Sequence, residues 1–169
     1  KLIEEPTRKN YFLLINNKSR PLLDTIKSRS LQIKIILNET RRLKIIKKLT
    51  DLHNIQQILD PKTSKLSPGN YLKYNFLCNE LRIDPINNYI ENLTILLNTY
   101  KKNKDIIYIH LAYFIADCYL NDLMKKKLFK INKMYEIKDF IFKNLNKYIT
   151  HNLNHNSLIE AVNRKLNYG

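Results

Sequence analysis

Glycine is almost absent from this chain. Its 169 residues include two glycines, Gly69 and Gly169, and no tryptophan. A phosphate-binding loop of the G-x-x-x-x-G-K-[ST] type requires two closely spaced glycines and a following lysine. The sequence given contains no such loop and cannot bind ATP through one. No Ser/His/Asp grouping or carboxylate pair marks an independent active site either.

Cysteine is equally scarce. Cys78 and Cys118 are the only two, and they lie far apart on apolar helical patterns. Neither a disulfide framework nor a C-x-x-C metal site is predicted, which fits a reducing cytoplasm. His110 stands eight residues before Cys118, but no further ligand is near in sequence, so we favour core packing over a metal site for both.

Long apolar runs are missing as well. The most apolar stretch, residues 106–120, is interrupted by His110 and Asp117 and is shorter than the ~20 residues that span a bilayer. The chain opens at Lys1 inside an apparent helix end, without an initiator Met or a signal-peptide pattern. We therefore expect a soluble, cytoplasmic protein, and we expect this sequence to be part of a longer one.

Acidic residues are few relative to basic ones. Lys and Arg number 30 against 15 Asp and Glu, a formal charge of +15. Such a charge suits a basic helical module that neutralises nucleic-acid phosphates. Lys greatly outnumbers Arg, however, and Asn, Ile and Tyr are abundant too, which is the composition that an AT-rich coding sequence gives. Direct DNA binding by this chain stays an open alternative.

Residues 1–37 have an α/β pattern. Pro6 ends a helix, and residues 11–15 are a short run of β-formers typical of a buried parallel strand. A short helix over 22–26 follows, closed by residues 28–30, and residues 31–35 alternate as a strand does. Two strands alone make no stable parallel sheet, so we expect the trailing edge of a larger α/β domain.

From residue 38 onward the pattern is helical, so the predicted fold class is mainly α. We divide it into a small helical lid over 38–82 and a helical bundle over 83–169. In the lid we expect a basic helix from Asn38, a shorter one over 51–59, and one capped by Ser67 with Pro68 at its first position, running to Leu81.

The bundle begins at Asp84-Pro85, which repeats the same start signal. Apolar residues then mark three amphipathic helices and, over 106–124, one that is apolar on most sides and so belongs at the centre. Ser157 and Glu160 form a capping box for the last helix. The apolar stripes are Ile86, Ile90, Leu93, Leu97 and Tyr100; Met134, Ile137, Ile141, Leu145 and Tyr148; and Val162 and Leu166.

Three segments in order carry a family resemblance: LIEEP at 2–6, FLLI at 12–15 and LLDTIKSRS at 22–30. They resemble the second half of the AAA+ core of bacterial clamp-loader subunits, with its helix end, sensor-1 strand and serine-arginine-cysteine motif. Ser30 replaces the cysteine. The helical remainder resembles the family in architecture alone, as a lid followed by the collar domain through which the subunits assemble.

The resemblance implies a role for Arg29 as an arginine finger, which stabilises the transferring phosphoryl group on a neighbouring subunit. By residue type alone the favoured interpretation of Arg29 is an arginine at a helix C-terminus that interacts with the dipole or a nearby carboxylate, and only the resemblance favours the finger. Asn16 occupies the sensor-1 position, where a polar side chain orients water in an ATPase and is a relic in a non-ATPase. ATP and Mg²⁺ would be held by neighbouring subunits, and zinc by the family's front part.

Within the family, Gly69 stands where the ATP-binding gamma/tau type has a lid arginine, because residues 66–70 read LSPGN. This favours the delta-prime type, an accessory subunit of DNA polymerase III that assembles with gamma/tau and delta to load the sliding clamp on primed DNA. The alternatives are the rear half of an ATP-hydrolysing AAA+ subunit and the basic nucleic-acid-binding module.

Overall fold

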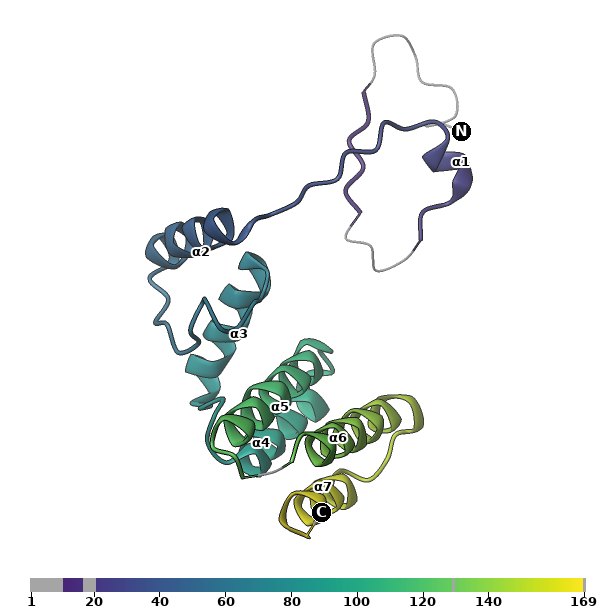
Figure 1. The fold of residues 1–169 in the computed structure, drawn as a ribbon. Helices are drawn as coiled ribbons and strands as arrows, with labels where there is room; N and C mark the ends of the chain where they lie inside the picture. Colours follow the sequence, from purple (N-terminus) through teal and green to yellow (C-terminus); the bar gives the residue numbers. More distant parts are fainter. Residues whose placement is uncertain (1–10, 17–20, 129, 169) are drawn as a thin grey trace. The chain divides into compact units, whose positions relative to one another are not determined.

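The structure, a computed structural model, describes residues 11–16, 21–128 and 130–168. In this part of the chain it has helices and no strand, so the mainly α fold class is confirmed. The chain divides into unit 1 (Lys1–Asn38) and unit 2 (Glu39–Gly169). The helices are α1 (Asp24–Lys27), α2 (Glu39–His53), α3 (Pro68–Leu81), α4 (Tyr89–Asn103), α5 (Ile107–Lys125), α6 (Ile131–His151) and α7 (His155–Tyr168) (Figure 1).

Unit 1 lacks the two strands that the sequence predicts. Residues 11–16 and 31–37 are irregular in the structure, and the predicted helix end at 2–6 lies outside the described residues. Leu13 and Ile35 are each 90% exposed, and α1 buries no residue. A strand needs a hydrogen-bonding neighbour, and none is formed within the described residues of unit 1. The α/β pattern is therefore not realised here.

Helices α2 and α3 pack against each other in unit 2. The sequence predicts two helices over 38–59, but α2 is a single helix that runs to His53. The predicted helix over 51–59 is wrong, because Asn54 adopts a left-handed φ of 50° and ends α2. Asn is one of the few residue types that enter this conformation readily.

One side chain of α3 holds the irregular segment that follows α2. The Asn75 side chain, fully buried, accepts hydrogen bonds from the backbone N–H groups of Ile58 at 2.9 Å and Leu59 at 3.0 Å. Its amide nitrogen donates to the Tyr71 carbonyl at 2.9 Å, and the Tyr71 hydroxyl donates to the Leu59 carbonyl at 2.7 Å. Buried backbone groups that no helix or strand satisfies are thus satisfied by side chains.

The start of α3 is confirmed and the predicted start of α4 is wrong. Ser67 precedes α3, and its hydroxyl accepts from the backbone N–H of Asn70 at 3.4 Å. Before α4, the Asp84 carboxylate instead accepts from the Ile86 N–H at 3.0 Å, forming a local turn. Asn88 caps α4, accepting from the Glu91 N–H at 3.3 Å and donating to its carboxylate at 2.8 Å.

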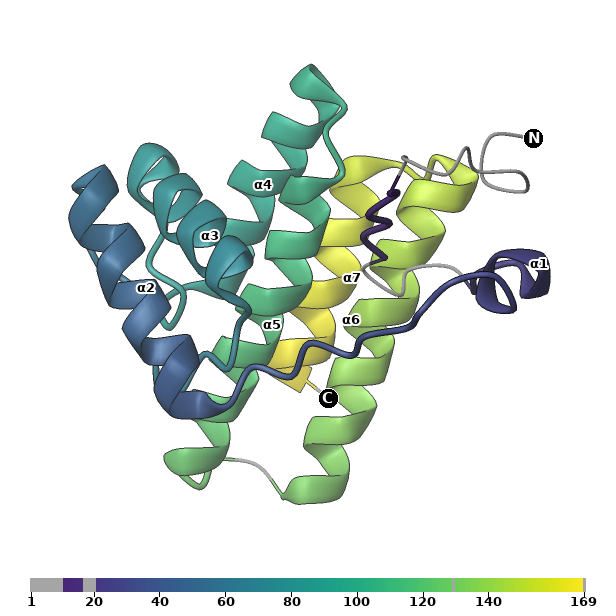
Figure 2. The ribbon, with the colours of Figure 1, turned by 90° about the horizontal axis from the view of Figure 1, so that it is seen from above.

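Helices α4 to α7 form a four-helix bundle. Each packs on the next in sequence, and α7 returns to pack on α4, so the four close a ring around one core. Figure 2 shows the four helices running alongside one another, with α4 and α5 next to the α2–α3 pair. The apolar helix α5 contributes the most buried side chains: Ile109, Leu111, Ala112, Ile115, Ala116, Leu120 and Leu123. No described helix combines the length and apolarity needed to cross a membrane.

The stripe predicted for α6 is confirmed residue by residue, since the buried side chains of α6 are Met134, Ile137, Ile141, Leu145 and Tyr148. The capping box at Ser157 is wrong. Helix α7 starts two residues earlier, and the Asn154 side chain accepts from the N–H groups of Asn156 at 2.9 Å and Ser157 at 3.4 Å. Asn caps as well as Ser does, and Asn154 comes first.

Three helices end in the same hydrogen-bonded turn without glycine. After α2, α3 and α5, the residues Asn54, Arg82 and Lys127 take left-handed φ values of 50°, 55° and 56°. In each turn the next backbone N–H reaches back five residues, as from Ile83 to Cys78 at 2.9 Å. This is the Schellman motif, which usually places glycine at the left-handed position. Arg and Lys at that position are conformationally costly.

Candidate functional site at the end of α1

The predicted arginine finger lies in the turn that closes α1. The serines on either side of Arg29 bond back to the carbonyls of the helix: the Ser28 hydroxyl donates to Thr25 at 3.1 Å, and the Ser30 hydroxyl to Ile26 at 2.7 Å. The backbone N–H of Arg29 also donates to Ile26, at 3.2 Å. These bonds satisfy carbonyls that the end of a helix leaves without partners. Ser28 therefore has a structural role in this turn.

Arg29 is exposed where this turn leaves the helix. Within α1, Lys27 pairs with the Asp24 carboxylate at 2.8 Å, so Asp24 already has one cationic partner. An exposed guanidinium presents a planar fork of donors that fits two oxygens of a phosphate. The turn thus sets the backbone geometry from which the Arg29 side chain extends, and its role as a finger stays a prediction.

Asn16, the other predicted site residue, is the last described residue of the irregular segment 11–16 and is exposed. The strand that would orient it at a sensor-1 position is not formed in the structure. Its predicted role, whether in positioning water or as a relic, is therefore not tested.

Gly69, which stands where the gamma/tau type has its lid arginine, lies in the first turn of α3. Gly69 is the second residue of this helix and is exposed, and a Cβ added there would meet no atom within 4 Å. The site therefore has room for a side chain, and no steric demand explains the glycine. Because glycine has no side chain, α3 has no positive charge at the position of the gamma/tau lid arginine.

The two residues considered as metal ligands, His110 and Cys118, do not lie close enough together to share a metal ion. His110 and Cys118 stand eight positions apart on α5, which is about 12 Å of helical rise. His110 is exposed, so the core packing predicted for it is wrong, whereas Cys118 is partly buried. Burial raises the pKa of the Cys118 thiol to about 11 and that of Cys78 to about 12. Both thiols are therefore protonated and poorly reactive at neutral pH.

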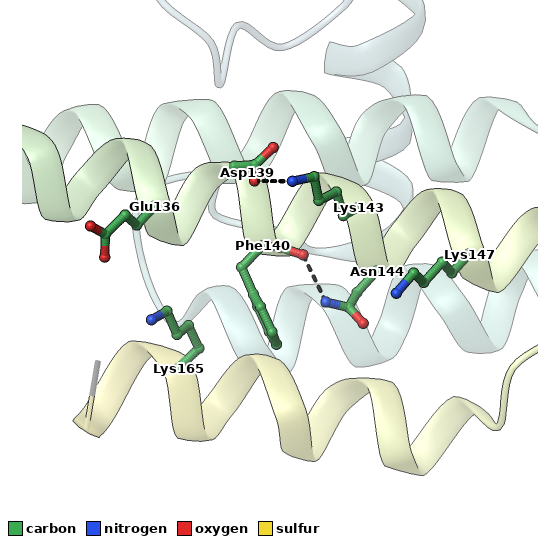
Figure 3. A pocket seen from close by; sticks show the side chains of 7 residues that line it. All are labelled: Glu136, Asp139, Phe140, Lys143, Asn144, Lys147 and Lys165. Carbon is green, nitrogen blue, oxygen red and sulfur yellow. Dashed lines mark hydrogen bonds and ion pairs between the residues drawn. The ribbon is translucent and has the colours of Figure 1, made fainter.

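A hollow of about 420 Å³ lies between α6 and α7 (Figure 3). In it, Lys143 pairs with Asp139 at 2.7 Å, and the Asn144 side chain donates to the Phe140 carbonyl at 2.8 Å. Figure 3 shows the Phe140 ring directed toward α7, where Lys165 borders the hollow. Its lining residues are Glu136, Asp139, Phe140, Lys143, Asn144, Lys147 and Lys165. No Ser, Cys or His is among them, so this hollow offers ion pairs but no nucleophile or imidazole base.

Sequence reasoning missed two features. One is the role of Ser30, which replaces the cysteine of the family motif: its hydroxyl makes the shorter of the two side-chain bonds at the end of α1. The other is the turn between α5 and α6. Its run of lysines, interleaved with Leu128 and Ile131, was the available signal for a surface that is both basic and apolar.

Comparison with known proteins gives one match. The profile of the family described as DNA polymerase III, delta subunit matches residues 1–39. No curated protein and no solved structure matches the chain. The matched segment contains Asn16, α1 and Arg29, and it ends at the first residue of α2. Residues 1–39 are therefore similar in sequence to this DNA polymerase III family, and all but the first residue of unit 2's helices lie beyond the match.

Proposed function

We propose that this chain belongs to a clamp-loader subunit of the delta-prime type, acting in DNA replication in the cytoplasm. It would assemble with gamma/tau and delta subunits and place Arg29 at a neighbour's ATP and Mg²⁺ while the sliding clamp is loaded on primed DNA. The observation that carries the proposal is the family match over residues 1–39, because this segment contains the exposed Arg29 and the serine-bonded turn beside it.

The exposed apolar side chains of unit 1 support a larger AAA+ core. Leu13, Ile15 and Ile35 are each 90% exposed, and Tyr11 is 96% exposed. Exposed apolar side chains at this density mark surfaces that pack against something else. An α/β core with further strands would cover them and give residues 11–15 and 31–35 the neighbours that a sheet requires.

Gly69 supports the accessory type over the ATP-hydrolysing type. In the alternative, this chain is the rear half of a gamma/tau-like ATPase, whose lid arginine senses nucleotide. A glycine with open space around it provides no such contact. The upstream reading frame separates the two: an intact phosphate loop there favours the ATPase, and a degraded one favours the delta-prime type.

The decisive experiment substitutes Arg29 in the full-length protein within the reconstituted complex. Arg29→Ala should leave assembly unchanged and lower DNA-stimulated ATP hydrolysis at the site it serves by at least about tenfold, because arginine fingers contribute 10³ or more in related phosphoryl transfer. Arg29→Lys should not restore the rate, since lysine lacks the planar fork. Arg164→Ala, which changes an exposed arginine of α7, is the matched control. Unchanged turnover in Arg29→Ala would remove the proposed role.

A second candidate function, a basic nucleic-acid-binding module, is favoured by the outer face of α2. Four exposed cations lie there, Arg41, Lys44, Lys47 and Lys48, on the side away from the buried Ile46. A face of this kind suits phosphate contacts. Duplex DNA binding that falls steeply with added salt, and that is lost when these four are changed to glutamine, would support it. Absence of binding at low salt would exclude it.

A further inference from the structure

The turn between α5 and α6 forms a second hollow, of about 580 Å³, lined by Met124, Lys127, Lys130, Ile131 and Asn132. We define the α5–α6 tip as the described residues 124–128 and 130–135. The tip lies at one end of the four-helix bundle, and among its described residues only Met134 is buried. Its composition differs from that of the α6–α7 hollow, because here apolar side chains are exposed together with the lysines.

Apolar exposure at the tip is high. Leu128 is 61% exposed, Ile131 60% and Tyr135 69%, while the adjacent Leu123 and Met134 are buried. The bundle core therefore takes one side of each helix and leaves a second apolar surface outside. Large apolar side chains gathered on an exposed surface commonly mark an interaction site.

The end of α3 provides an internal comparison for Leu128. In the Schellman motif, the residue after the left-handed position usually packs against its own helix. After α3 the residue in this place is Ile83, which is buried at 2% exposed. Leu128 takes the equivalent place after α5, and its N–H donates to the Leu123 carbonyl at 3.2 Å, yet its side chain is 61% exposed. The same backbone turn thus presents an apolar side chain outward at the tip.

The tip is also strongly basic. Residues 122–135 contain five lysines, Lys125, Lys126, Lys127, Lys130 and Lys133, and a single carboxylate, Asp122. Asp122 pairs with Lys126 at 2.6 Å. The complementary partner surface therefore carries negative charge together with apolar side chains.

The shape and side-chain types favour a peptide over other polyanions. Single-stranded nucleic acid is held by aromatic platforms on which bases stack, whereas the described apolar residues here are mainly aliphatic. An anionic bilayer is flat, and a hollow lined by Met124 and Ile131 suits an inserted side chain better. We propose that the α5–α6 tip docks a peptide segment of a partner protein in which aspartate or glutamate alternates with large apolar residues.

The test selects peptides from a displayed random library on this chain and measures their affinity by fluorescence anisotropy. The enriched peptides should combine acidic and large apolar residues. Their binding should weaken at least about tenfold with Leu128→Ser plus Ile131→Ser, and likewise with Lys127→Glu plus Lys130→Glu. All four side chains are exposed, so these variants should fold, which circular dichroism checks.

Matched controls come from the rest of unit 2. Phe76→Ser removes an apolar side chain of similar exposure, 57%, from α3, and Lys44→Glu plus Lys47→Glu makes the same charge change on α2. Both should retain binding. The proposal is overturned if no enriched peptide depends on the tip, or if the two charge reversals weaken binding equally. It is also overturned if the tip variants lose oligonucleotide or anionic-vesicle binding but no peptide binding. None of these outcomes bears on Arg29.

Discussion

Tyr74 of α3 and Phe114 of α5 pack with their ring centroids 5.3 Å apart and their planes inclined by 39°. This contact joins the α2–α3 pair to the four-helix bundle. Tyr74 is only 7% exposed, and burial raises the pKa of its hydroxyl. The two sequence regions predicted as lid and collar are therefore in contact through this aromatic pair, and both belong to one unit. A domain boundary near residue 83 stays a prediction.

We expect Phe114→Ala to lower the free energy of unfolding of the chain by about 2–3 kcal/mol, because it removes a large, partly buried ring. A double-mutant cycle with Tyr74→Leu should give a coupling energy of about 0.5–1.5 kcal/mol, the usual range for aromatic pairs. Urea denaturation followed by circular dichroism measures all four proteins. Additive effects would mean that the rings contribute only their separate burial.

The core stripe of α6 predicts a contrast within one helix. Ile141 is fully buried, whereas Tyr135 is 69% exposed. Ile141→Ala should lower the free energy of unfolding by about 2–5 kcal/mol, and Tyr135→Ala should change it by less than about 0.5 kcal/mol. Thermal denaturation of the two variants distinguishes them. A large effect at Tyr135 would show that the exposed face of α6 is covered in solution.

His155, the first residue of α7, predicts a pH dependence. Burial, and secondarily the charge of Lys101, lower its pKa below the usual 6.5, and its Nδ1 is buried without a hydrogen-bond partner among the described residues. The unfolded chain therefore binds a proton more readily than the folded one does. The free energy of unfolding should be unaffected above pH 7, should fall as pH drops through about 6.5, and should level off below the folded pKa.

Urea titrations between pH 5 and 8 measure this slope. His155→Gln should flatten it, because glutamine does not titrate. Phe76→Ser serves as the control, since it changes an exposed side chain that does not titrate, and it should leave the slope unchanged. An identical slope in wild type and His155→Gln would assign the dependence to other groups.

The left-handed turn after α3 predicts a stabilising substitution. Arg82 has a φ of 55° and is exposed, so glycine would relieve the conformational cost there at the expense of a more flexible unfolded chain. We expect Arg82→Gly to raise the free energy of unfolding by about 0.5–1 kcal/mol. Arg82→Ala should give no gain, because alanine also resists this φ. Equal stability of the two variants would mean that the left-handed φ at this position has no measurable net cost.

The helices of unit 2 were largely predictable because their apolar residues recur with helical spacing. The five buried residues of α6 and the Ser67-Pro68 start of α3 are the clearest cases. Their signals are local: a stripe of one face and a cap followed by proline depend on nothing outside the helix.

Helix starts in asparagine-rich segments were less predictable. Asp84 and Asn88 both accept backbone hydrogen bonds well, and so do Asn154 and Ser157, so several positions compete for one cap. The structure selects Asn88 for α4, and at the start of α7 Asn154 accepts the bonds. The sequence alone gives no ranking among neighbours that cap with similar strength.

The predicted strands of unit 1 failed for a different reason. Residues 11–15 and 31–35 have the right residue types, but a strand exists only with a partner. The predicted roles of Arg29 and Asn16 have the same dependence, because a finger acts on another subunit and a sensor acts within a complete core. Such roles require an assembly that the chain does not contain by itself.

Asn75 has one more consequence. Because this α3 side chain binds the Ile58 and Leu59 N–H groups, the course of the segment after α2 is encoded in a helix that follows it. Most side chains of that segment can therefore change without altering its course. Divergent homologues should be aligned in this region on the asparagine equivalent to Asn75, and not on the residues between α2 and α3.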